Sequence, residues 1–127
     1  MKNLFERAEE FIWQNARLLE RRLFDFHFRS GSSQAVLSAL RAYQNKDGGY
    51  GNALEPDIRC PESQPVPTQH ALEILDTTGF DEMMVRECAN FFSALLQKKA
   101  VFHSCCLLFA IIRTHRGGIQ KITREPH

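Results

Sequence analysis

Apolar side chains recur at steps of three and four from residue 4 to about residue 28, the spacing of an amphipathic helix. Asn3 and Glu6, three positions apart, have the spacing of a capping box at its start. Ser30-Gly31-Ser32-Ser33 interrupts the pattern and supplies an N-cap for the next element. The pattern therefore predicts one long helix from Asn3, with an apolar stripe made of Leu4, Phe5, Ala8, Phe11, Ile12, Ala16, Leu19, Leu23 and Phe24.

Three shorter helices are predicted further along the chain. The second spans about Ser33 to Gln44, and the third runs from near Thr68 to the stop signal Thr78-Gly79. Asp81 is placed to cap a fourth. No convincing run alternates with period two, so no strand is required. We predict an all-α protein with short connections between helices.

One connection, residues 45–67, is long and rich in glycine and proline. A loop of this length inside a compact domain is usually functional or disordered. Tyr50, Leu54 and Ile58, at steps of four, could pin it onto the helices, which favours order.

Residues 40–51, Leu-Arg-Ala-Tyr-Gln-Asn-Lys-Asp-Gly-Gly-Tyr-Gly, carry a family resemblance. They resemble the Q-x-x-D-G-G-aromatic-G repeat of the α/α-toroid superfamily, which contains squalene–hopene-type terpene cyclases and protein prenyltransferase β subunits. Residues 33–77 are similar to one repeat with its connecting loop. The resemblance implies helical hairpin repeats that form an incomplete arc of a toroid, as an N-terminal fragment of a bacterial-type member. The residues that match the motif are Gln44, Asp47, Gly48, Gly49, Tyr50 and Gly51.

We expect this motif to be structural rather than catalytic, as is usual for a repeat element. The amide of Gln44 lies near a helix end, where it could bond carbonyls that lack partners or the N-terminus of the next repeat's helix. The glycines allow the chain to reverse, and Tyr50 could stack against that amide.

Catalytic candidates must come from elsewhere, and the acidic cluster with which toroid cyclases protonate an alkene is absent from the sequence. Glu55 and Asp57 flank Pro56 and could serve as acid and base at a cavity mouth. The alternative is an ordinary solvated loop.

A metal site is the second open question. The resemblance to prenyltransferases implies zinc bound through Asp, Cys and His, and Asp57, Cys60 and His70 are of these types. Their spacing differs from the family pattern, so a chance grouping is the alternative, and the sequence requires no cofactor.

Charge divides the 127-residue chain into two segments. Residues 1–97 carry ten basic and fourteen acidic side chains, whereas residues 98–127 carry six basic and one acidic. We therefore predict a toroid-like segment, 1–97, followed by a basic, atypical tail, 98–127. The net charge of +1 argues against a nucleic-acid partner. No run of about 20 apolar residues could span a membrane, and neither a secretory signal nor a paired-cysteine motif is present, which predicts a cytoplasmic protein.

The tail could be out of frame relative to a longer parent protein. Read one base out of register with permissible codons, residues 99–118 give Gly-Gly-Val-Pro-Phe-Val-Leu-Pro-Ser-Val-Arg-Asp-Tyr-Pro-His-Ala-Pro-Trp-Trp, which is closer in style to residues 45–67. A closed toroid needs about a dozen helices, and four or five are predicted here. The apolar run 101–112 is then either accidental sequence or a genuine fifth helix.

Two functions follow from these expectations. The first is a truncated protein of the terpenoid cyclase or prenyltransferase type, catalytically incompetent by itself. The second is a helical scaffold or protein-interaction module without enzymatic activity. In both, apolar helix faces left without neighbours would favour self-association.

Overall fold

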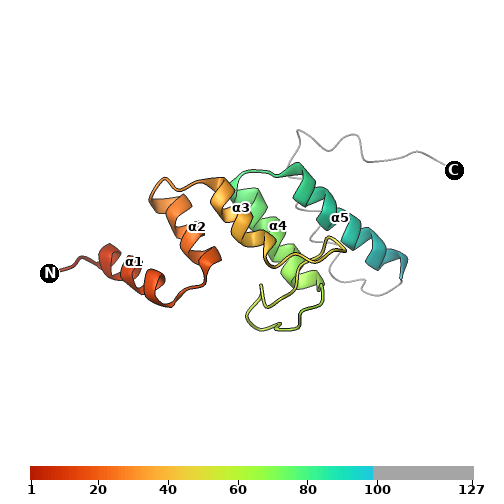
Figure 1. Cartoon of the computed structure of the whole chain (residues 1–127), viewed down its shortest axis with the longest axis horizontal. Coiled ribbons are helices and arrows are strands. Elements are labelled where there is room, and N and C mark those ends of the chain that lie inside the picture. The colour runs from red at the N-terminus through yellow and green to blue at the C-terminus, as the bar shows by residue number, and fades with distance from the viewer. Residues whose placement is uncertain (99–127) are drawn as a thin grey trace.

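The computed structural model describes residues 1–98, which contain five α-helices, turns and one long loop (Figure 1). No strand occurs in this part of the chain, only two isolated bridges at Tyr50. The all-α prediction is thereby confirmed for these residues. The predicted basic tail lies outside the described residues, apart from Lys98. The helices are α1 (Leu4–Asn15), α2 (Leu18–Phe28), α3 (Ser33–Arg41), α4 (Pro65–Thr78) and α5 (Glu82–Gln97).

The prediction of one long helix before Ser30 is wrong, because the chain breaks between α1 and α2. Ala16 and Arg17 have extended backbones, with φ/ψ of −82°/158° and −70°/166°. From this position the Arg17 guanidinium donates to the carbonyl oxygens of Ala53 (2.6 Å) and Leu54 (3.1 Å) in the long loop. The break thus coincides with an anchor between α2 and a segment more than thirty positions away.

Most of the predicted helix ends are observed. Asn3 and Glu6 form the reciprocal capping box, with bonds of 2.8 and 3.0 Å. The Asp81 carboxylate accepts from the amide of Met84 at 2.9 Å and caps α5. Gly79 ends α4 with φ of +109°, in the region that favours glycine.

Two boundaries differ from prediction. α3 ends at Arg41 rather than at Gln44, because the next residues form a turn in which Tyr43 and Gln44 bond three residues back, to Leu40 and Arg41. α4 begins at Pro65 rather than near Thr68. A proline is well tolerated there, since an amide in the first turn would have no helical partner.

Each helix packs mainly on its neighbours in the chain: α1 on α2, α2 on α3, α3 on α4 and α4 on α5, with α2 and α3 the most extensive pair. Figure 1 shows this as a row from α1 to α5, with α4 lying beside α3. The main core lies between α2, α3, α4 and α5 and includes Tyr50 and Leu54 from the long loop, both completely buried. Its helical members include Leu19, Val36, Leu40, Ala71, Leu75, Met84, Cys88 and Phe91.

The helix α1 contributes no buried residue. Phe5 contacts the rings of Phe24 and Phe28 on α2, with centroids 5.7 and 5.9 Å apart. Leu4 and Phe11, two members of the predicted apolar stripe, are 81% and 66% exposed. The periodicity predicted helical structure here correctly, although not the end of α1 at Asn15, and residues 1–98 supply a neighbour for only one side of α1.

No helix within residues 1–98 is long and apolar enough to cross a membrane.

Candidate functional site

The motif residues belong to an ordered double turn, residues 43–51 together with 61–64, which we call the clasp. In its backbone, the amide of Asn45 donates to the carbonyl of Gly49 (2.9 Å), and the amide of Gly51 donates to the carbonyl of Tyr43 (3.1 Å). The amide of Gln64 in turn donates to the carbonyl of Tyr50 (2.9 Å). The long loop therefore returns onto itself before α4 begins.

Gln44 connects the clasp to α5. Its side-chain amide donates to the Glu87 carboxylate at 2.9 Å and to the carbonyl oxygen of Gly48 at 3.4 Å. Arg41 lies 3.9 Å from the same carboxylate. We expected this amide to bond carbonyls that lack partners or a helix N-terminus. It does reach a carbonyl, that of Gly48, but its shorter bond is to a side chain in the second turn of α5. Stacking of Tyr50 on this amide stays a prediction.

The glycines of the motif allow close approach between segments. Gly48 has φ of +85°, and a Cβ there would lie 2.2 Å from the carbonyl oxygen of Glu87. A Cβ on Gly49 would meet the Phe91 ring at 2.6 Å, and one on Gly51 the carbonyl oxygen of Glu62 at 2.2 Å. Each glycine lets the loop lie directly against another part of the chain, and two of these contacts are with α5.

Tyr50 is the buried centre of the clasp. Its backbone amide donates to the hydroxyl of Thr68 at 2.9 Å, and that hydroxyl donates to the carbonyl of Gln64 at 2.7 Å. The phenol oxygen is buried with no hydrogen-bond partner among the described residues. Burial, and the neighbouring Cys88, raise the pKa of this phenol. Burial likewise raises the pKa of the Cys88 thiol to about 12.

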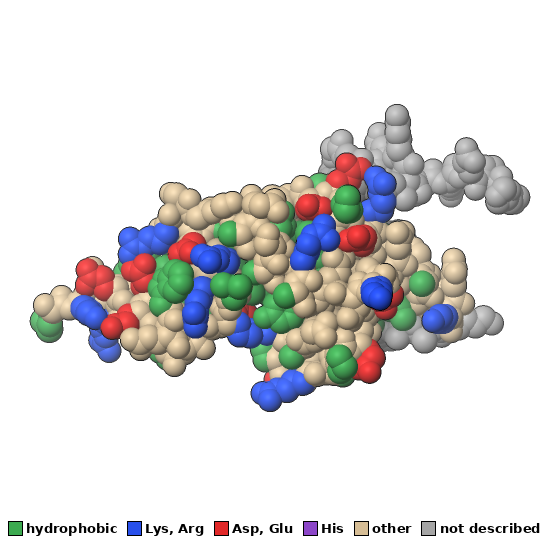
Figure 2. All heavy atoms as spheres, in the orientation of Figure 1, with side chains coloured by type: hydrophobic (Ala, Val, Ile, Leu, Met, Phe, Trp, Pro, Cys, Tyr) green, Lys and Arg blue, Asp and Glu red, His purple; other side chains and the backbone are tan. Residues whose placement is uncertain are grey.

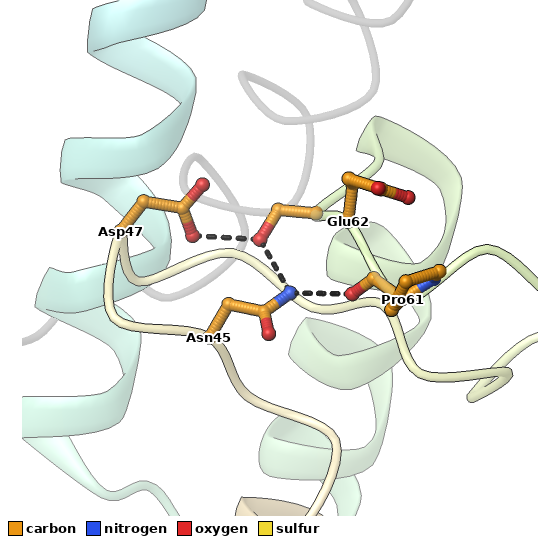
Figure 3. Close-up of a pocket in the computed structure, with 5 residues that line it drawn as sticks. Asn45, Asp47, Pro61 and Glu62 are labelled. Carbon is orange, nitrogen blue, oxygen red and sulfur yellow. Dashed lines mark hydrogen bonds between the residues drawn. The ribbon is translucent and has the colours of Figure 1, made fainter.

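An open pocket of about 360 Å³ lies at the clasp, and Figure 3 shows the residues that line it. The Asp47 carboxylate accepts from the hydroxyl of Ser63 (2.6 Å) and the amide of Gly49 (3.0 Å). The Asn45 side-chain amide donates to the Ser63 hydroxyl (3.0 Å) and the Pro61 carbonyl (2.9 Å). Figure 3 shows the carboxylate of Glu62, the fifth lining residue, directed away from Asp47.

The hydrogen bonds of this pocket are suited to holding the loop together rather than to catalysis. The hydroxyl of Ser63 contacts a carboxylate and an amide, not an imidazole that could activate it as a nucleophile. The two histidines among residues 1–98, His27 and His70, do not line the pocket. The polar atoms of the pocket hold the two halves of the loop together.

Neither of the proposed catalytic carboxylates lines this pocket. Glu55 is half-buried and Asp57 is exposed. Glu20, hydrogen-bonded to Arg17, raises the pKa of that guanidinium, and Glu55 adds a smaller contribution. Glu55 directly follows Leu54, whose carbonyl oxygen accepts from Arg17, and so lies next to the anchor between α2 and the loop.

The metal candidates are not brought together. No group of three or more His, Cys, Asp or Glu side chains that could hold a metal ion occurs among residues 1–98. His70 lies 3.7 Å from Glu73, one turn further along α4, and the thiol of Cys60 donates to the carbonyl of Glu62 at 3.9 Å. Asp57, Cys60 and His70 thus do not form such a group.

Several residues that hold the clasp were not expected from the sequence. Glu87, Ser63 and Thr68 have no sequence signal that links them to the motif, because their contacts are set by the tertiary fold. Arg17 likewise has no sequence signal that links it to the loop, yet its guanidinium anchors residues 53 and 54.

Comparison with known proteins gives no match: no family model, no curated protein and no solved structure is similar to this chain.

Proposed function

We propose that residues 1–97 are a repeat segment of a terpenoid cyclase- or prenyltransferase-like α/α toroid, catalytically incompetent by itself. In this proposal the clasp holds one helix pair and sets the position of the next helix. The function of the segment is then architectural: it supplies part of the wall of a ring whose cavity other repeats complete.

The observation that carries the proposal is the contact between the clasp and α5. Gln44 reaches Glu87, and Gly48 packs against the backbone of that same residue. The side-chain amide of Gln44 and the backbone of Gly48 both contact α5, the helix that follows the pair α3 and α4. Such a motif is suited to join successive elements of a repeat array. The row of helices, each packed on its successor, is the arrangement that such an array needs.

A scaffold without enzymatic activity is the second candidate. It is favoured by the internal hydrogen bonds of the pocket at the clasp and by apolar side chains exposed at both ends of the row. Leu4 and Phe11 are exposed on α1, and Met83 and Leu96 on α5. Such side chains are suited to contact a protein partner.

The experiment that separates the two candidates compares two proteins. One is this chain, and the other continues after Lys98 in the alternative reading frame. Binding of a prenyl diphosphate or of stoichiometric zinc is measured for both by calorimetry. The toroid proposal expects no binding by this chain and binding of at least one of the two by the longer protein. Failure of the longer, folded protein to bind either one would contradict it and favour the scaffold.

A further inference from the structure

The outward face of α1 is an apolar stripe without a neighbour in the described chain. Leu4, Ala8 and Phe11 follow the spacing i, i+4, i+7 and share one side of the helix, and all three are exposed. A different side, which includes Phe5 and Glu9, contacts α2 through the ring of Phe28 and through an ion pair with Arg29. Within residues 1–98, nothing covers this stripe.

The charges around this stripe suit a second copy of the same chain. Residues 1–32 carry six basic and five acidic side chains, and Figure 2 shows the two signs interspersed over this end of the molecule. A two-fold interface brings the same surface together twice, so a surface of one sign would repel its own copy. A mixed surface does not.

We propose that α1 is a self-docking surface on which two copies of the chain pair through antiparallel α1 helices. In this arrangement Phe11 of each copy packs over the small side chain of Ala8 of the other. Large opposite small is the condition for two helices to approach closely. The two-fold axis makes the contact occur twice.

A charge pair accompanies the apolar contact. Arg7 forms no ion pair among residues 1–98, and it lies on the same flank of the stripe as Glu10. In the antiparallel arrangement Arg7 lies near Glu10 of the second copy, again twice. Glu10 already contacts Lys2 at 2.8 Å through one carboxylate oxygen, which leaves the other oxygen for this pair.

The size of the contact predicts a weak dimer. A 12-residue helix is about 18 Å long, and one such stripe buries less than the roughly 800 Å² per partner that is typical of stable complexes. We therefore expect dimerisation that depends on protein concentration. This proposal does not depend on the proposed function, because it requires neither a ring nor a ligand.

Sedimentation velocity of the full chain over a range of concentrations tests the proposal. We expect a monomer–dimer equilibrium that Phe11→Glu weakens about tenfold or more, because it puts a charge into the apolar contact. Met83→Glu, an equally exposed apolar position on α5, is the matched control and should leave the equilibrium unchanged. Circular dichroism should show both variants folded, since neither side chain is buried.

Charge reversal tests the antiparallel register. Arg7→Glu should weaken the dimer by placing like charges together, and the double change Arg7→Glu with Glu10→Arg should restore it. A chain that stays monomeric at its highest soluble concentration would overturn the proposal. So would a dimer that Met83→Glu dissociates and Phe11→Glu does not, or a single reversal that the double change fails to rescue.

Discussion

The side-chain amide of Gln44 and the carboxylate of Glu87 form a hydrogen bond of 2.9 Å between residues that are 43 positions apart. It joins the turn that follows α3 to the second turn of α5. Because α4 lies between them in sequence, this single contact closes a loop that contains a whole helix. The contact is the clearest observation behind the view that the motif is a structural element.

The coupling between Gln44 and Glu87 can be measured by a double-mutant cycle. Alanine at each position, singly and together, should give a coupling of about 1 kcal/mol in the free energy of unfolding. This is below the roughly 1.5–3 kcal/mol typical of a bond to a charged group, because Glu87 is partly exposed. The control pair is Arg86 and Glu82, fully on the surface of α5, for which about 0.3–0.5 kcal/mol is expected. Equal couplings would contradict a special role for Gln44.

Gly48 should tolerate no side chain. Gly48→Ala combines a positive φ with a Cβ 2.2 Å from the Glu87 carbonyl oxygen, and we expect it to lower the free energy of unfolding by about 3 kcal/mol. Gly79→Ala is the control, since φ is also positive there but the nearest neighbour of its Cβ is 3.9 Å away. It should cost about 1–2 kcal/mol, from backbone strain alone. Chemical denaturation of both variants measures the difference, and a smaller loss at Gly48 would argue against close contact with α5.

The hydroxyl of Tyr50 should contribute nothing to stability. It is buried without a partner among the described residues, so Tyr50→Phe should leave the free energy of unfolding unchanged or raise it by up to about 1 kcal/mol. Tyr50→Ala, which removes the ring itself, should cost about 4 kcal/mol. A loss above about 1 kcal/mol for Tyr50→Phe would mean that the hydroxyl is hydrogen-bonded in solution.

Alkaline pH should destabilise the protein through Cys88. Its thiol has a pKa of about 12 in the folded chain, raised by burial from 9.0, so the unfolded chain releases this proton first. The contribution of the protonated thiol to the free energy of unfolding is therefore fully present below pH 9.0. It is lost as pH rises towards 12, by up to about 1.4 kcal/mol per pH unit. Urea denaturation at several pH values measures the slope.

Two variants check the origin of this slope. Cys88→Ala should flatten it from pH 9.0 upward, whatever the variant's absolute stability. Tyr50→Phe should flatten it only above pH 10.0, because burial also raises the pKa of that phenol from this value. An unchanged slope in Cys88→Ala would show that the thiol is accessible to water in the folded chain.

Local signals in the sequence identified most helix ends correctly. The capping box of Asn3 and Glu6, the cap at Asp81 and the stop at Gly79 act through neighbouring residues, so they are visible in a short window. The break at Ala16–Arg17 was missed because the apolar spacing continues through it. What accompanies the break is the bonding of Arg17 to the carbonyls of residues 53 and 54, a contact that no window of sequence reveals.

In the candidate site too, the sequence predicts local features but not contacts between distant residues. The order of the loop and the burial of Tyr50 and Leu54 followed from their spacing, but Ile58 of the same series is only half-buried. The partner of Gln44 could not be predicted, since Glu87 is one of many charged residues on predicted helices. The candidate carboxylates Glu55 and Asp57 are close in sequence, yet the described pocket is lined by residues on either side of them.

Hydrogen exchange of three clasp amides tests the central claim most directly. The amide of Tyr50 donates to the Thr68 hydroxyl, that of Gly51 to the Tyr43 carbonyl and that of Gln64 to the Tyr50 carbonyl. If the clasp is a structural part of the core, these amides exchange as slowly as those in the middle of α4, while the exposed Lys46 exchanges freely. Exchange of all three at the rate of Lys46, with α4 still protected, would contradict it.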